Sequence, residues 1–153
     1  MSRFNFMKHL TSLQPLFALT KQLHASTLEP KLRDLVLMRV SQINGCAYCL
    51  DMHSKDARAA GETEQRLYVL PAWRETPFYD ARERAALAWC EALTQLPAHD
   101  QSVPDALYEQ ACAQFDEKEL VDLTLLVTLI NSWNRINIAA RPEVGDYKPG
   151  MFG

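Results

Sequence analysis

The sequence predicts an all-α protein of about six or seven helices, and two observations lead to that fold class. Apolar residues recur every three or four positions in segments whose ends carry proline, glycine or capping residues. No segment alternates apolar and polar residues as a half-buried strand would, and no hairpin or internal repeat competes with the helical pattern. A chain of 153 residues with ordinary composition fits one domain over residues 1–153.

The first half of the chain contains four helical patterns, separated by turn signals. The predicted helices are Pro15 to about Ala25, Pro30 to about Ile43, Cys46 to about Ala60, and Glu64 to about Leu70. Asn44-Gly45 is a typical helix stop and predicts a turn between the second and third helices. Gly61 predicts the end of the third helix, Thr63 is a capping residue for the fourth, and a loop containing Trp73 follows.

Three further helices are predicted in the second half, from Asp80 to about Leu96, from Pro104 to about Phe115, and from Asp116 to about Ala140. Asp116 and Glu119 have the spacing of a capping box. The last helix is more apolar than one buried face requires, so it is either the central core helix or also a subunit contact. We therefore expect a homo-oligomer, such as a dimer, trimer or hexamer. The tail after residue 141 should be irregular or packed on a neighbour, and His99 should lie on the surface.

Composition excludes several classes of partner. The net charge is −3, with basic and acidic residues interspersed, which provides no electrostatic footprint for nucleic acid. No run approaches the roughly eighteen apolar residues that span a bilayer, and the N-terminal segment lacks the apolar core of a secretory signal. These features predict a cytoplasmic protein without a membrane partner. In a reducing compartment, a Cys-x-x-Cys pair is more often catalytic or metal-bound than a permanent disulfide.

The chemical signal is concentrated in Cys46, Cys49 and His53. On a helix these positions share one face, so two thiols and an imidazole would lie along about two turns. A helix N-terminus favours a thiolate over a thiol, and an imidazole four residues after Cys49 is placed to accept its proton. The pattern predicts a redox or nucleophilic site with neither cofactor nor metal.

Other interpretations of the same residues remain open. The three side chains are also three potential zinc ligands, with Asp34 or a distant residue as the fourth. The two cysteines are alternatively a buried structural pair. Leu50 occupies the position where c-type haem attachment needs histidine, and Cys90 and Cys112 stand alone, which argues against an iron–sulfur cluster. We expect Cys90 to be a small core residue.

A longer stretch from Asp34 to His53 resembles the alkylhydroperoxidase D-like proteins of the carboxymuconolactone decarboxylase superfamily. The combination is an acid twelve residues before the first cysteine, the Cys-x-x-Cys pair, and a histidine four residues after the second cysteine. The resemblance covers about residues 15–141 and includes the segments 61–63, 72–75, 83–89 and 131–135.

This resemblance implies an oligomeric thiol peroxidase that reduces hydroperoxides. Cys46 and Cys49 would cycle between dithiol and disulfide, His53 would act as the base, and Asp34 stands where the family usually has glutamate. Tyr48 replaces a histidine of the best known peroxidase of the family. An external dithiol, on a lipoyl group or a thioredoxin-like protein, would regenerate the thiols.

The sequence leaves three alternatives open. The helix N-terminus favours Cys46 as the attacking sulfur, whereas the spacing to His53 favours Cys49. A lactone-processing or decarboxylase-like enzyme is the second enzymatic interpretation, although that branch works without a thiol pair. A non-enzymatic helical oligomer whose disulfide controls assembly fits the same residues.

Overall fold

The computed structural model describes residues 2–97 and 103–151, and within these ranges it contains helices and no strand, which confirms the all-α prediction. His99 lies outside the described residues. The elements are η1 Phe6–His9, α1 Leu10–His24, α2 Pro30–Asn44, α3 Ala47–Ala59, α4 Glu64–Val69, η2 Leu70–Glu75, α5 Ala81–Thr94, α6 Asp105–Cys112 and α7 Glu117–Ala140, where η1 and η2 are 3₁₀ helices.

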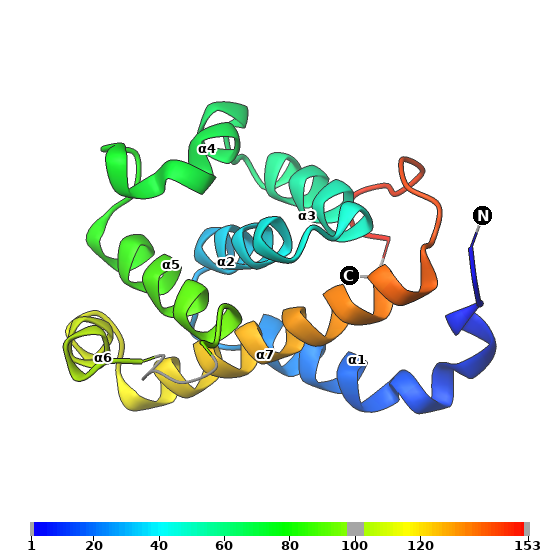
Figure 1. Ribbon diagram of the computed structural model, residues 1–153, viewed down its shortest axis with the longest axis horizontal. Coiled ribbons are helices and arrows are strands. Elements are labelled where there is room, and N and C mark those ends of the chain that lie inside the picture. The colour runs from blue at the N-terminus through cyan, green and yellow to red at the C-terminus, as the bar shows by residue number, and fades with distance from the viewer. Residues whose placement is uncertain (1, 98–102, 152–153) are drawn as a thin grey trace.

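Helix α2 is the element around which the others pack. It contacts α3, α5 and α7, and α1 lies alongside α7 (Figure 1). One apolar cluster between α1, α2, α5 and α7 includes the fully buried side chains of Leu23, Val36 and Leu123. A second cluster, with Leu35 and Leu70 at its centre, joins α2 to α3, η2 and α5. The central position of α2 matters because its C-terminal end leads directly into the Cys-x-x-Cys segment.

The apolar run in α7 has a structural explanation in these clusters. Six of its aliphatic side chains are buried in the first cluster: Leu120, Leu123, Leu126, Val127, Leu129 and Ile130. A helix that contacts five others needs apolar residues on more than one face. The helix begins with the predicted capping box, in which the Asp116 carboxylate accepts from the Glu119 N–H and the Glu119 side chain accepts from the Asp116 N–H.

The predicted start of the first helix was wrong. Helix α1 begins at Leu10, five residues before Pro15, so this proline lies inside the helix rather than in its first turn. A proline within a helix removes one backbone hydrogen bond. Pro15 is exposed, whereas Leu13, in the turn before it, is buried, and α1 packs against α7. Tertiary packing on both sides of the proline therefore outweighs its local preference.

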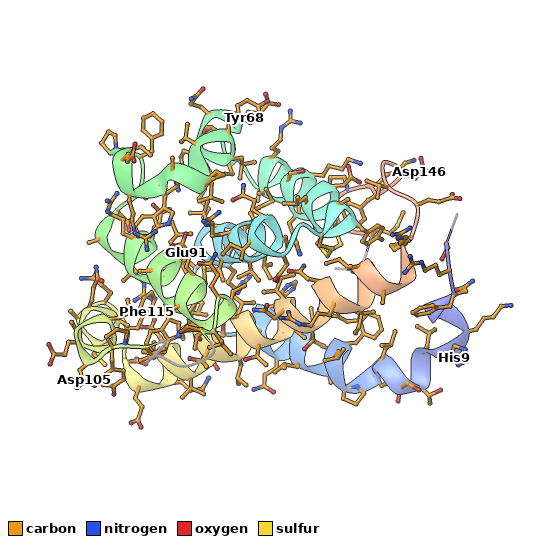
Figure 2. The ribbon with its side chains drawn as sticks, viewed as in Figure 1. His9, Tyr68, Glu91, Asp105, Phe115 and Asp146 are labelled. Carbon is orange, nitrogen blue, oxygen red and sulfur yellow. A yellow bond between two sulfur atoms is a disulfide. The ribbon has the colours of Figure 1, made fainter. Side chains whose placement is uncertain are left out.

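The expected loop around Trp73 is also partly wrong, because residues 70–75 form the 3₁₀ helix η2. Trp73 is buried, and its indole Nε1–H donates to Glu91 Oε1 on α5 at 2.9 Å. Arg39 on α2 and Arg74 on η2 also bind the Glu91 carboxylate, at 2.6 and 2.5 Å. Burial acts to raise the pKa of Glu91, but the hydrogen bonds from Trp73, Arg74 and Arg39 outweigh it and lower the pKa. This carboxylate, labelled in Figure 2, ties α2, η2 and α5 together.

Candidate active site

The Cys-x-x-Cys segment lies at the junction of α2 and α3. Gly45 ends α2 in the left-handed conformation, with φ at 67°, which glycine adopts without the steric cost that a side chain would add. Cys46 follows as the N-cap of α3, so the helix begins at Ala47, one residue later than the sequence predicted. Its backbone N–H donates to the Ser41 carbonyl at 3.1 Å, and its Sγ accepts from the Cys49 N–H at 3.3 Å. The turn therefore fixes the first sulfur at the positive end of the helix.

Cys46 and Cys49 are joined by a disulfide, with their Cα atoms 5.3 Å apart. Their exposed fractions are 1% and 0%, so the bond lies inside the protein surface. The other cysteines do not take part. Cys90 is buried in the first apolar cluster, as predicted, and its burial raises the pKa of the thiol, while Cys112 is exposed on α6. Among the described residues, Cys46 and Cys49 are therefore the cysteines that are joined to each other.

Asparagines on α7 hold this junction in place. The Asn44 amide, at the end of α2, donates to Asn131 Oδ1 at 3.0 Å and to Asn134 Oδ1 at 2.9 Å. Asn134 is fully buried and donates in turn to Ser41 Oγ at 3.1 Å. Asn137, one turn further along, donates from Nδ2 to Cys49 Sγ at 3.4 Å. Sequence reasoning missed this contact, although three asparagines spaced by three in an apolar helix were a visible signal.

His53 lies one helical turn after Cys49 on α3, as predicted. The side chain as a whole is partly exposed, but its Nε2 is buried and has no hydrogen-bond partner among the described residues. Burial, with a smaller contribution from the neighbouring His24, lowers the pKa of His53 to about 4. The imidazole is therefore neutral at physiological pH, with one ring nitrogen unprotonated, and the same burial makes it a weaker base than a solvent-exposed histidine.

Asp34 lies on α2 and is half-buried. Burial raises its pKa to about 6, Arg33 opposes this rise, and the carboxylates of Asp56 and Glu62 add to it. Among the described residues, Asp34 forms no hydrogen bond with His53 or with either cysteine, so the structure does not bring the predicted acid into direct contact with the predicted base. A carboxyl group with this pKa exists in both protonation states near neutrality.

The C-terminal tail packs along α3. The Tyr147 hydroxyl donates to the Asp56 carboxylate at 2.9 Å, and Lys55 Nζ donates to the Gly145 carbonyl at 2.7 Å. Figure 2 shows Asp146 of this tail beside α3. The tail is irregular, as expected, but its partner is the helix that carries the cysteines and His53.

Within residues 2–97 and 103–151, no group of three or more His, Cys, Asp and Glu side chains is arranged to hold a metal ion. The zinc arrangement that the sequence left open is therefore not assembled in the disulfide form. No helix in these ranges has the length and hydropathy needed to cross a membrane.

The opposite pKa shifts of Asp34 and His53 predict opposite effects on stability. Asp34 has a folded pKa of about 6 against an ordinary value of 3.8. Its contribution to the free energy of unfolding is therefore present below pH 4 and is lost as pH rises through 6. His53 has a folded pKa of about 4 against 6.5, so its contribution is present above pH 6.5 and is lost as pH falls through 4. Folding thus favours the neutral form of both groups. Between pH 4 and pH 6.5, their effects on the pH dependence of the free energy of unfolding have opposite signs and offset each other.

Single substitutions should separate the two slopes. In urea unfolding of the disulfide form at pH 7, the free energy of unfolding of Asp34→Asn should exceed that of the wild type by about 1 to 2 kcal/mol, which allows for the water that reaches this side chain. The difference should disappear by about pH 4. His53→Gln should instead become relatively more stable as pH falls. Parallel profiles for both variants and the wild type would contradict the assigned shifts.

A sequence model of the carboxymuconolactone decarboxylase family matches residues 13–92. The chain belongs to this family. Two relatives are similar over most of its length, and both are uncharacterized proteins. YdfG of Bacillus subtilis is 51% identical over 120 residues, which is 78% of each chain. YnjA of Escherichia coli is 34% identical over 114 residues, which is 74% of this chain and 61% of YnjA.

Solved structures place this family member among the AhpD-like proteins. A protein of unknown function from Agrobacterium tumefaciens, provisionally assigned to antioxidant defence as AhpD, superposes with a TM-score of 0.89. It is 35% identical, over 96% of this chain and 100% of that one. An uncharacterized peroxidase-related protein from a Silicibacter species has a TM-score of 0.78 at 25% identity, over 94% and 75%. The debrominase Bmp8 has the same TM-score at 22% identity, over 92% and 75%, and shares the fold alone.

Proposed function

We propose that this AhpD-like protein is a thiol peroxidase that reduces hydroperoxides with the Cys46–Cys49 pair. The observation that supports this most strongly is the arrangement at the start of α3. The two sulfurs are close enough to form a disulfide, and His53 follows one turn later with a buried Nε2 that has no hydrogen-bond partner in the described part of the chain. Peroxide reduction needs an attacking thiolate, a second thiol and a proton acceptor.

The proposed reaction has two chemical steps. Cys49 loses its proton to His53, and its thiolate attacks one peroxide oxygen, which breaks the O–O bond and leaves a Cys49 sulfenic acid and an alkoxide. The alkoxide takes a proton and leaves as an alcohol. The Cys46 thiol then attacks the sulfenic sulfur, forms the disulfide and releases water. The two electrons that reduce the peroxide come from the two thiols.

Asp34 is proposed to supply the proton for the alkoxide. A pKa of about 6 keeps a useful fraction of this carboxyl protonated near neutrality. Because Asp34 does not contact His53, the transfer between them is proposed to run through water or through the substrate itself. Aspartate is one methylene shorter than the glutamate usual in the family, which is consistent with this indirect route.

The disulfide must then be reduced from outside. We propose a dithiol donor, on a lipoyl group or on a thioredoxin-like protein, as the electron source, with the cytoplasm as the compartment that maintains it. We also propose a homo-oligomer. Phe17 on α1 and Ile138 on α7 are each more than 40% exposed, and such side chains are suited to contact between subunits.

A single-turnover experiment tests the proposed function. Fully reduced protein is mixed with a limiting amount of cumene hydroperoxide, and peroxide loss is measured together with the redox state of tryptic peptide 40–55, which contains both site cysteines. We expect one peroxide to be consumed for each Cys46–Cys49 disulfide formed. Cys112→Ser, which removes the exposed cysteine outside the site, should leave this stoichiometry unchanged. Intact peroxide with both thiols retained would overturn the proposal.

A further inference from the structure

The two sulfurs of the pair have different hydrogen-bond donors. Cys46 Sγ accepts from a backbone group, the N–H of Cys49, at 3.3 Å. Cys49 Sγ accepts from a side chain on another helix, Asn137 Nδ2 of α7, at 3.4 Å. A disulfide sulfur has no proton to donate, so the amide must present its NH₂ group rather than its oxygen. The contact therefore has a defined direction, from α7 to the second sulfur.

This donor gains strength when Cys49 is reduced and ionised. A disulfide sulfur is a weak acceptor, whereas a thiolate carries a full charge, and hydrogen bonds to charged groups are roughly twice as strong as neutral ones. The amide itself has no net charge and does not titrate. It can therefore favour the Cys49 thiolate without raising or lowering the pKa of His53 through a charge of its own.

The backbone of α7 around Asn137 is held in place before the reaction begins. Asn134, one turn earlier, binds both Asn44 and Ser41 at the end of α2, and Asn131 binds Asn44 as well. These bonds hold α7 in register with the turn that carries Cys46. A donor held in place costs little further ordering when charge develops on the sulfur.

We propose that Asn137 is a catalytic residue of this protein, whose amide stabilises the Cys49 thiolate and makes Cys49 the attacking sulfur. The catalytic role rests on the proposed function, but the effect of Asn137 on the pKa of the Cys49 thiol can be measured without peroxide. The step is an ionisation in which the Cys49 S–H bond breaks and its proton passes to His53 or to water. Nothing is oxidised or reduced.

The test measures the pKa of each thiol separately. Cys46→Ser isolates Cys49, and serine retains an oxygen suited to the N-cap position. The rate of iodoacetamide alkylation is followed against pH by mass spectrometry of peptide 40–55, so that Cys90 and Cys112 do not contribute. In this background, Asn137→Leu, which has nearly the same shape but no donor, should raise the Cys49 pKa by about one unit, a tenfold loss of thiolate below the pKa.

Two further measurements decide whether the effect is specific. Asn137→Asp places a negative charge beside the sulfur and should raise the Cys49 pKa more than Asn137→Leu does. In the Cys49→Ser background, Asn137→Leu should move the Cys46 pKa by less than a third of the shift at Cys49. Asn137→Ala serves in place of Asn137→Leu if leucine prevents folding.

The matched control is Thr128→Val, a substitution of nearly the same shape on the same helix, which removes a hydroxyl that donates to the Thr124 carbonyl rather than to the α2–α3 junction. An unchanged Cys49 pKa in Asn137→Leu, or an equal shift in Thr128→Val, would overturn the inference. Because alkylation needs no peroxide, a pKa shift without peroxide turnover would support the role of Asn137 and count against the proposed function alone.

Discussion

Replacement of Cys49 by serine should abolish peroxide consumption, with a fall in rate of at least about a thousandfold, because a serine hydroxyl is neither ionised nor oxidised under these conditions. Cys46→Ser should behave differently. It should consume one equivalent of peroxide and stop at a Cys49 sulfenic acid, since no second thiol remains to form the disulfide. Dimedone labelling of peptide 40–55, followed by mass spectrometry, detects that sulfenic acid directly.

The comparison between the two variants identifies the attacking sulfur. Both carry the same substitution, three residues apart at the start of one helix, so a general loss of structure should affect them alike. The opposite pattern, with Cys46→Ser inactive and a sulfenic acid on Cys46 in Cys49→Ser, would assign the attack to Cys46. It would also remove the proposed purpose of the Asn137 contact.

The parts of the fold that the sequence predicted well are those with local causes. Asn44-Gly45 ends α2 because a glycine adopts the left-handed conformation cheaply, and Asp116 starts α7 through a capping box with Glu119. These signals act within a few residues and can be read without knowing the rest of the protein.

The parts that were missed depend on contacts between distant segments. The start of α1 before Pro15 depends on packing against α7, and η2 is held by a tryptophan that reaches Glu91 on α5. Neither partner can be identified from the residues next to Pro15 or Trp73. The local preference of proline gave the wrong start for the same reason.

In the candidate site, too, the features with local causes were predicted and those that depend on distant contacts were missed. The sequence could assign Cys46, Cys49 and His53 to the same turn and helix because the signals for that turn and helix are local. It could not place Asp34 relative to His53, since the two lie on different helices, and the direct contact is absent. Asn137 escaped attention because it is 88 residues from Cys49, and only the packing of α7 against α3 brings it to the sulfur.

His53→Gln should slow single-turnover oxidation of Cys49 by about a hundredfold at pH 7, the lower range for loss of a general base. The pH dependence provides the sharper test. In the wild type, neutral His53 is available at every pH above its pKa of about 4, so the rate should be level from about pH 5 until the thiol itself titrates. Without this base, hydroxide must take the proton, and the rate should rise about tenfold for each pH unit.

His24→Gln is the matched control, because it removes the imidazole whose charge affects His53 but leaves the proposed base in place. Its rate at pH 7 should remain near that of the wild type, where both imidazoles are neutral. Rapid-quench measurement of Cys49 oxidation between pH 5 and pH 8 gives all three profiles. If His53→Gln retained the level profile of the wild type, another group would have to accept the Cys49 proton. The buried His53 Nε2, which has no hydrogen-bond partner among residues 2–97 and 103–151, would then need a different explanation.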